Sequence, residues 1–125
     1  MKEEKNTIIK KHLISYKYGM RGIWLAFCYE HSMRFHLVAA IAVIILNYVL
    51  KVDHTEWLIT LILIGLAWMA EIFNTAIEKL ADKVTTNHDT LIGQVKDLAS
   101  GAVLIICLFS ALCAAIIYLP YLYKY

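Results

Sequence analysis

Three long apolar runs constrain this 125-residue chain more than any other feature of its sequence. They extend from about 33 to 50, from about 57 to 77 and from about 98 to 119. A helix needs roughly 20 apolar residues to cross the hydrocarbon core of a bilayer, and each run is close to that length. The third run carries no charge, and Pro120 favours an end directly after it. We therefore predict an all-α integral membrane protein with three transmembrane helices.

The composition supports one membrane domain. The chain is 61% hydrophobic and has only one Pro and five Gly, and neither a linker nor an internal repeat divides it, so we expect a single domain over 1–125. The net charge of +2 is too small to indicate a nucleic-acid partner. The cysteines lack the CxxC spacing of a zinc site and are odd in number, which predicts no disulfide framework: Cys28, Cys107 and Cys113.

The distribution of Lys and Arg predicts the orientation in the membrane. Segment 51–56 has one lysine and the end of the chain has one, whereas segment 79–96 has three. Because cytoplasmic segments are enriched in Lys and Arg, we expect a cytoplasmic N-terminus and a cytoplasmic loop between the second and third spans. Most basic residues outside the spans precede the first one, at Lys2, Lys5, Lys10, Lys11, Lys17 and Arg21.

An amphipathic helix is predicted over about 6–29, ahead of the first span. Such a helix can lie in the membrane interface with its apolar stripe in the acyl boundary, or it can pack against the bundle. The stripe has helical spacing and consists of Ile9, Leu13, Tyr16, Met20, Ile23 and Phe27. At the opposite side of the membrane, aromatic residues fit an interfacial belt: Trp57, Tyr118, Tyr121 and Tyr123.

One face of the second span carries the most informative polar residues. Glu71, Asn74, Glu78 and Asp82 recur at helical spacing and share that face. Glu71 lies inside the apolar run, where a carboxylate carries an insertion cost of about 2.5–3.5 kcal/mol. That cost favours a functional role for Glu71. For Asp82, capping and solvation of the helix end explain the residue equally well.

Further polar residues are expected at the same membrane face. Glu30 precedes the first span, and Lys96 and Asp97 precede the third. Phosphoryl transfer from ATP to a lipid alcohol needs cations near the phosphates, carboxylates for Mg²⁺ and a proton acceptor, and these residues include each type. The sequence has neither a P-loop nor a protein-kinase catalytic loop. A kinase with these residues would therefore use another scaffold.

An ion carrier or channel is the alternative function. Glu71 and Glu78 could form a carboxylate ring around a pore in an oligomer. A conducting path needs polar residues on both sides of the membrane. In the outer halves of the spans, however, the only polar residues are Asn47, Thr60 and Ser110. This asymmetry counts against a channel.

The motifs resemble those of the prokaryotic diacylglycerol kinase family, which includes undecaprenol kinases. The matching strings are Glu71-Ile-Phe-Asn74-Thr-Ala-Ile-Glu78, then Asp82, then Lys96-Asp97-Leu-Ala-Ser-Gly-Ala-Val-Leu, with Glu30 and Arg34 ahead of them. The resemblance covers roughly residues 10–119. It implies a homotrimer in the bacterial cytoplasmic (inner) membrane, with a surface helix on each subunit, active sites shared between subunits, and Mg²⁺ with ATP as phosphoryl donor. An inactive scaffolding relative is a further alternative.

The resemblance also implies roles for individual residues. Glu71 corresponds to the general base, and Glu30 and Glu78 to the Mg²⁺ ligands. Contacts to the nucleotide are implied for Asn74, Glu78, Asp82, Lys96 and Asp97, and contacts to the lipid substrate for Glu71, Arg34 and Ser100.

The choice of lipid depends on the stretch Glu30-His-Ser-Met-Arg34-Phe-His36. His36 stands where the best-known enterobacterial form has a carboxylate, and the stretch resembles the Gram-positive undecaprenol kinase branch. Undecaprenol is therefore the predicted substrate, with diacylglycerol as the alternative.

Overall fold

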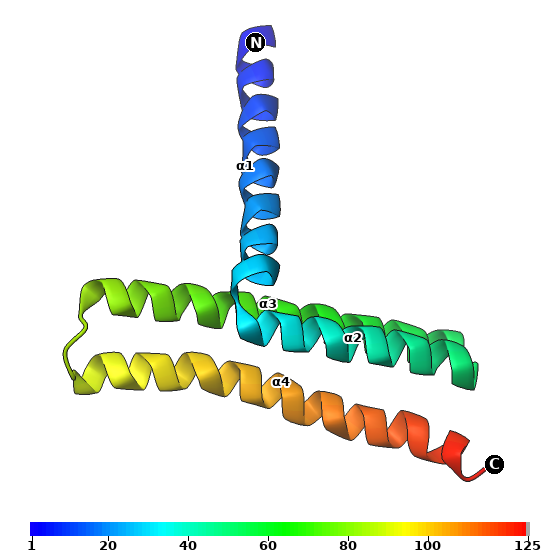
Figure 1. Ribbon diagram of the computed structural model, residues 1–125. Coiled ribbons are helices and arrows are strands. Elements are labelled where there is room, and N and C mark those ends of the chain that lie inside the picture. Colours follow the sequence, from blue (N-terminus) through cyan, green and yellow to red (C-terminus); the bar gives the residue numbers. More distant parts are fainter. Residues whose placement is uncertain (125) are drawn as a thin grey trace.

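The computed structural model describes residues 1–124 and consists of four helices (Figure 1). They are α1 (Lys2–Tyr29), α2 (His31–Leu50), α3 (His54–Val84) and α4 (Thr90–Leu122). The last three are long and apolar enough to cross a membrane. The predictions of an all-α fold and of three candidate spans are confirmed.

The helices extend beyond the apolar runs from which the spans were predicted. α3 continues to Val84, and α4 already begins at Thr90. The side chain of Asp89 accepts a hydrogen bond from the backbone N–H of Ile92 (2.9 Å) and thereby caps the start of α4. Polar residues can continue a helix outside hydrocarbon because water solvates their side chains. The expected polar face of α3 is therefore one unbroken helix surface.

Pro120 lies inside the last turn of α4 instead of after its end. The ring removes one backbone donor, but the helix needs only two more residues before it stops at Leu122. The backbone N–H of Tyr123 closes this turn on the carbonyl of Leu119 (3.3 Å). Proline thus marks the end of the helix to within one turn.

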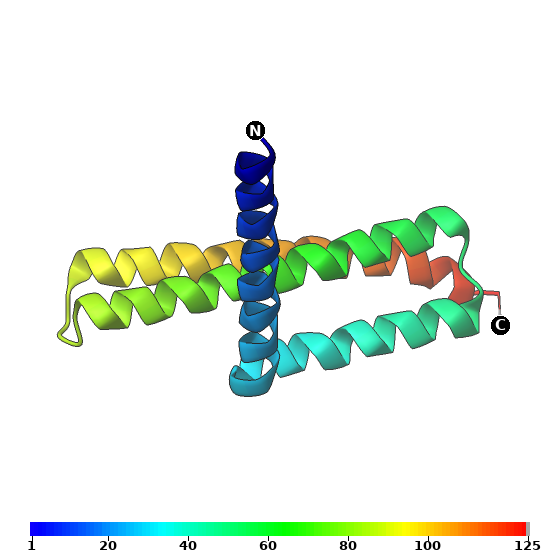
Figure 2. The same ribbon diagram turned by 90° about the horizontal axis from the view of Figure 1, so that it is seen from above.

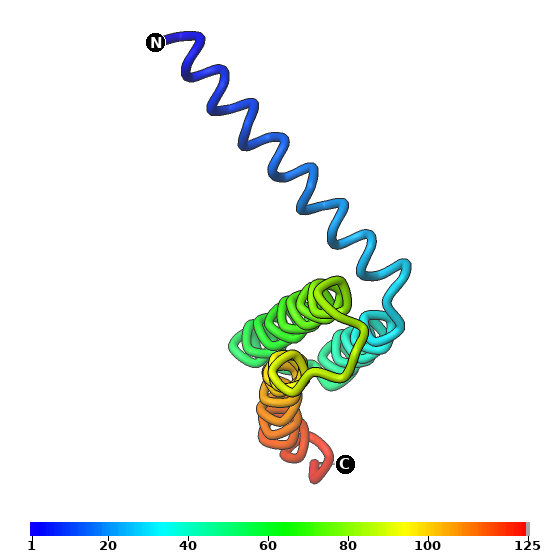
Figure 3. The backbone as a smooth tube through the Cα atoms, turned by 90° about the vertical axis from the view of Figure 1, so that its left-hand side faces the viewer, coloured from blue at the N-terminus to red at the C-terminus, as the bar shows by residue number. Residues whose placement is uncertain are grey.

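The three spans form a bundle in which α3 contacts both of its neighbours. Its contact with α4 is the most extensive in the molecule, because the two helices form a hairpin around the short loop 85–89. α2 packs against α3 from another side, and the view along the bundle shows the three helices grouped together (Figure 3). Residues on the inward faces of these helices are thereby brought near one another.

Helix α1 projects away from the bundle and runs across the direction of the spans (Figures 1 and 2). Residues 1–25 are all exposed, whereas Ala26 is buried where α1 meets α2. The ring of Phe27 meets the edge of Trp68 of α3 at a centroid distance of 5.0 Å. Packing of α1 against its own bundle is therefore confined to its last turn. A helix across the spans has the direction expected of one that lies in the membrane plane.

A buried polar network holds the bundle together at the end remote from α1. Asn47 of α2 is fully buried and donates a hydrogen bond to Thr60 of α3 (2.7 Å). The hydroxyl of Tyr118 of α4 donates to the Asn47 side-chain oxygen (2.5 Å). Val52 and Ile117 surround the tyrosine ring with buried apolar groups. One asparagine side chain thus connects all three spans.

This network corrects the prediction of an aromatic belt at Tyr118. The side chain is buried and packs in the bundle, because the hydrogen bond to Asn47 turns that face of α4 inward. Tyr121 is partly buried and donates to Glu56 (2.6 Å). Tyr123, at 86% exposure, is still available as an interfacial anchor.

Candidate active site

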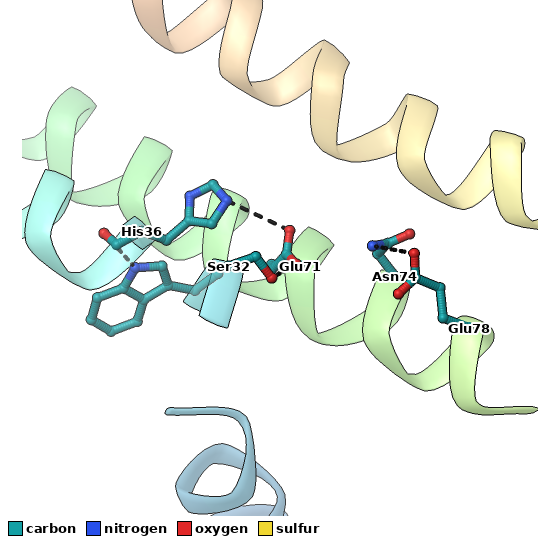
Figure 4. A network of polar contacts seen from close by, with 6 residues as sticks. Ser32, His36, Glu71, Asn74 and Glu78 are labelled. Carbon is teal, nitrogen blue, oxygen red and sulfur yellow. Dashed lines mark hydrogen bonds and ion pairs between the residues drawn. The ribbon is translucent and has the colours of Figure 1, made fainter. Parts of the chain in front are cut away.

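A buried carboxylate lies at the centre of the candidate site. Glu71 is on the inward face of α3 and only 4% exposed. The hydroxyl of Ser32, on α2, donates a hydrogen bond to Glu71 Oε1, and His36 Nε2 lies 3.5 Å from Glu71 Oε2 (Figure 4). A buried carboxylate is stable only with such polar partners. The structure therefore stabilises Glu71 by contacts from the neighbouring helix.

Asn74 follows Glu71 by one helical turn and is 9% exposed. Its amide nitrogen is 3.5 Å from Oε1 of Glu78, one turn farther along α3 (Figure 4). Its side-chain oxygen is buried and has no hydrogen-bond partner within residues 1–124. Native proteins rarely leave such an acceptor unpaired, because its lost solvation costs about 1–3 kcal/mol. The unpaired oxygen therefore marks a place where a ligand donor or a cation would be stabilised.

Two ion pairs extend the polar face of α3 towards α1 and α4. Glu30 connects α1 to α2, and its carboxylate is 2.8 Å from the ammonium group of Lys79. The ammonium group of Lys96, on α4, is 2.5 Å from the carboxylate of Asp82. Glu30, Asp82 and Lys96 therefore join the α3 polar face at the same end of the bundle as the loop 85–89.

Three of the predicted site residues lie elsewhere on the surface. Arg34, Asp97 and Ser100 are exposed, and within residues 1–124 no hydrogen bond or ion pair joins them to Glu71. Arg34 donates to the backbone carbonyl of Cys28 (2.9 Å). Asp97 lies in a shallow groove along α4 beside Gly101. A single chain thus brings together only part of the predicted residues.

The carboxylates fit Mg²⁺ only in combination with another ligand. Within residues 1–124, no group of three His, Cys, Asp or Glu side chains is placed to hold a metal ion. Mg²⁺ in kinases, however, is typically held by one or two carboxylates and completed by substrate phosphates and water. Glu78, with the unpaired oxygen of Asn74 on the same face, offers the oxygen donors that this ion prefers.

The contacts of two residues near Glu71 could not be predicted from the sequence. Ser32 is an unremarkable residue in the first turn of α2, and nothing in its local pattern shows that it faces residue 71. Trp68 donates a hydrogen bond to the backbone carbonyl of His36 (3.5 Å). From the sequence alone, Trp68 is simply one of the apolar residues of the second span. The one available signal is the spacing of Ser32 and His36, which places them on one face of α2.

Comparison with known families identifies the kind of protein to which this candidate site belongs. Residues 17–118 match the family described as prokaryotic diacylglycerol kinase. The chain belongs to the prokaryotic diacylglycerol kinase family. It is therefore a multi-pass membrane lipid kinase from a family of ATP-dependent kinases, as the sequence predicted. Membership in this kinase family decides against the alternative of a channel.

Members of the prokaryotic diacylglycerol kinase family are similar to this chain over most of their length. The undecaprenol kinase of Bacillus subtilis is 35% identical over 119 residues, which are 95% of this chain and 96% of that protein. The diacylglycerol kinase of Escherichia coli is 33% identical over 98 residues, which are 78% of this chain and 77% of that protein. The diacylglycerol kinase of Haemophilus influenzae is 32% identical over 103 residues, covering 82% and 83% of the two chains.

Proposed function

We propose that this lipid kinase transfers the γ-phosphoryl group of ATP to the hydroxyl of undecaprenol. The similarity to an undecaprenol kinase extends over 95% of the chain, whereas the similarity to the diacylglycerol kinase of Escherichia coli covers 78%. His36, the last residue of the stretch that favours a polyprenol, contacts Glu71 directly. Undecaprenol therefore has support from both the comparison and the site, and diacylglycerol is the alternative.

The observation that carries this proposal is the buried Glu71 with the unpaired Asn74 oxygen one turn away. Both lie where the apolar run of α3 gives way to a charged surface. A lipid hydroxyl can reach this level from the bilayer, and the triphosphate can reach it from water. Glu71 accepts the proton as the hydroxyl oxygen forms its bond to the γ-phosphorus and the bond to ADP breaks.

The remaining residues of the polar face bind the nucleotide. Glu78 and Glu30 hold Mg²⁺, which when bound neutralises charge on the phosphates. Glu30 has to exchange its ion pair with Lys79 for this role. Lys96, an ammonium group beside Asp82, provides a cation for the phosphates once that pair opens. Asn74 contributes its free oxygen and Asp82 an additional acceptor.

The site is completed in a homotrimer with its polar end in the cytoplasm. Arg34, Asp97 and Ser100 are exposed in the single chain, so each can face a neighbouring subunit and contribute to its site. Exposed apolar side chains on the spans provide contact surface for such neighbours. The excess of Lys and Arg before the first span supports a cytoplasmic N-terminus in the bacterial inner membrane.

The experiment that tests this function compares two lipids under one set of conditions. The purified full chain in lipid nanodiscs receives Mg-ATP and equal mole fractions of undecaprenol or diacylglycerol, and labelled phosphate in the lipid is measured. We expect kcat/KM for undecaprenol to exceed that for diacylglycerol by about tenfold or more, which corresponds to about 1.4 kcal/mol. A faster reaction with diacylglycerol would reject undecaprenol, and no transfer to either lipid would reject the proposed reaction.

A further inference from the structure

The two carboxylate oxygens of Glu71 have different surroundings. Oε1 accepts a hydrogen bond from the Ser32 hydroxyl, whereas Oε2 has the Nε2 of His36 as a neighbour at 3.5 Å. Ordinary N–H···O hydrogen bonds measure about 2.7–3.2 Å, so the imidazole is adjacent to Oε2 without fully occupying it. Oε1 thus has a hydrogen-bond donor, whereas Oε2 keeps the capacity to accept a hydrogen bond from a further donor.

Ser32 and His36 approach Glu71 from a common face of α2. They are four residues apart, and residues at this spacing lie above one another on a helix (Figure 4). The side chain of His36 is 12% exposed and that of Glu71 is 5% exposed, so bulk water competes little for their contact, whereas Ser32 is exposed. The pair therefore contacts a buried carboxylate from one helix surface.

The position of His36 is itself fixed by its surroundings. Its backbone carbonyl accepts the indole N–H of Trp68, which lies three residues before Glu71 on α3. The Trp68 ring packs edge-on against Phe27 of α1. Trp68 of α3, packed against Phe27 of α1, therefore fixes the α2 backbone at His36 relative to Glu71.

We propose that Ser32 and His36 are positioning residues that orient Glu71 as the proton acceptor, with Ser32 holding Oε1 and His36 directing Oε2 towards the lipid hydroxyl. This inference rests on the proposed function, in which Glu71 accepts that proton. In the step concerned, the hydroxyl proton moves to Oε2, the alcohol oxygen bonds to the γ-phosphorus, and ADP leaves with the electron pair of the broken P–O bond. In this step the side chains of Ser32 and His36 exchange no proton and act only through the carboxylate.

Orientation matters here because proton transfer requires close alignment of donor and acceptor. Displacing a reacting group by about 1 Å can reduce a rate by about 100-fold. Without Ser32 the carboxylate can rotate about its terminal torsion, which is broad and has no strong preference of its own. The expected consequence of losing either residue is a lower kcat with unchanged nucleotide binding.

The test uses the full chain in nanodiscs with four variants, Ser32→Ala, Ser32→Thr, His36→Leu and His36→Gln. We expect kcat to fall about 10- to 100-fold in Ser32→Ala and His36→Leu, with the KM for ATP unchanged. Ser32→Thr keeps the hydroxyl, and His36→Gln keeps a polar N–H at similar reach, so both should stay within about threefold of the wild type. Ser110→Ala, which removes a buried hydroxyl elsewhere in the bundle, is the matched control and should leave kcat unchanged.

The same substitutions in a Glu71→Gln background separate this inference from the proposed function. If Ser32 and His36 act through Glu71, they cause no further loss once the carboxylate is gone. Full turnover in Glu71→Gln alone would reject the proton-acceptor role itself. An inactive Glu71→Gln with fully active Ser32→Ala and His36→Leu would overturn only the positioning role. A parallel loss of ATP binding in those variants, or additive losses in the Glu71→Gln background, would overturn it as well.

Discussion

The hydroxyl of Tyr118 donates a 2.5 Å hydrogen bond to the side-chain oxygen of Asn47, 71 residues earlier in the chain. Both side chains are buried, and Asn47 in turn donates to Thr60. A polar network inside hydrocarbon must be fully paired, because lipid supplies no alternative partner. This contact lies at the opposite end of the bundle from Glu71, so the network stabilises the fold at a distance from the chemistry.

Tyr118→Phe should destabilise the protein without reducing catalysis. The substitution keeps the ring and leaves the Asn47 oxygen without its donor, and interhelical hydrogen bonds in membranes contribute about 0.6–1.7 kcal/mol. We expect the free energy of unfolding to fall by that amount, measured by denaturant unfolding in micelles, while kcat stays at the wild-type level. Tyr123→Phe removes an exposed hydroxyl and is the matched control. Equal stability of the two variants would contradict a stabilising role for the network.

Glu71→Gln should abolish most of the turnover. The amide has nearly the shape of the carboxylate but cannot accept the lipid proton, and general base catalysis contributes about 10²- to 10⁴-fold. We expect kcat to fall within that range while ATP binding and assembly persist. Glu56→Gln is the matched control on the same helix, since Gln can still serve in the Asp53–Glu56 capping box. A similar loss of kcat in both variants would show a general effect of changing a carboxylate in α3.

The polar face of α3 could be predicted from sequence because it depends only on the helical period. Glu71, Asn74 and Glu78 fall on one face of any α-helix that contains them, and the insertion cost of Glu71 already indicated a role. The spans followed from the length of the apolar runs in the same way. These inferences needed no knowledge of how the helices pack.

The remaining features depend on the rotation and packing of whole helices. Ser32 meets Glu71 only because α2 turns that face towards α3. Tyr118 points inward although a tyrosine near the end of a span equally suits an interfacial anchor. Likewise, adjacent residues of α4 diverge by about 100°, so Lys96 reaches Asp82 while Asp97 faces outward. Periodicity gives the relative angle of residues on one helix, but not the angle of that helix to its neighbours.

Lys79→Met should lower the Mg²⁺ concentration needed for half-maximal activity. The Lys79 ammonium group forms an ion pair with the Glu30 carboxylate. Removing this ammonium group leaves the carboxylate free to bind Mg²⁺. Exposed ion pairs contribute about 0.2–1 kcal/mol, so we expect a shift of up to about fivefold, measured by Mg²⁺ titration at fixed ATP. Lys83→Met removes the same charge one turn farther along α3 and is the matched control. Glu30→Gln should raise the required Mg²⁺, and an unchanged requirement in Glu30→Gln would contradict its role as a ligand.

Mixing two inactive variants tests whether the subunits of the proposed trimer share a site. Glu71→Gln changes the buried carboxylate, whereas Asp97→Asn changes an exposed residue of α4 that we place in the site of a neighbour. In a random mixture of equal amounts, about a quarter of such shared sites would combine an intact Glu71 with an intact Asp97.

We therefore expect activity to recover to about one quarter of the wild-type level when the two variants are unfolded together and reconstituted. The matched control mixes Glu71→Gln with Glu78→Gln. Both of these residues lie on α3 of one subunit, so every site in that mixture lacks a carboxylate and activity should stay absent. Recovery only in the first mixture requires Asp97 and Glu71 to come from different subunits. No recovery in either mixture would instead place Asp97 and Glu71 in a site formed by one chain, which requires α4 to rotate from its orientation in this structure.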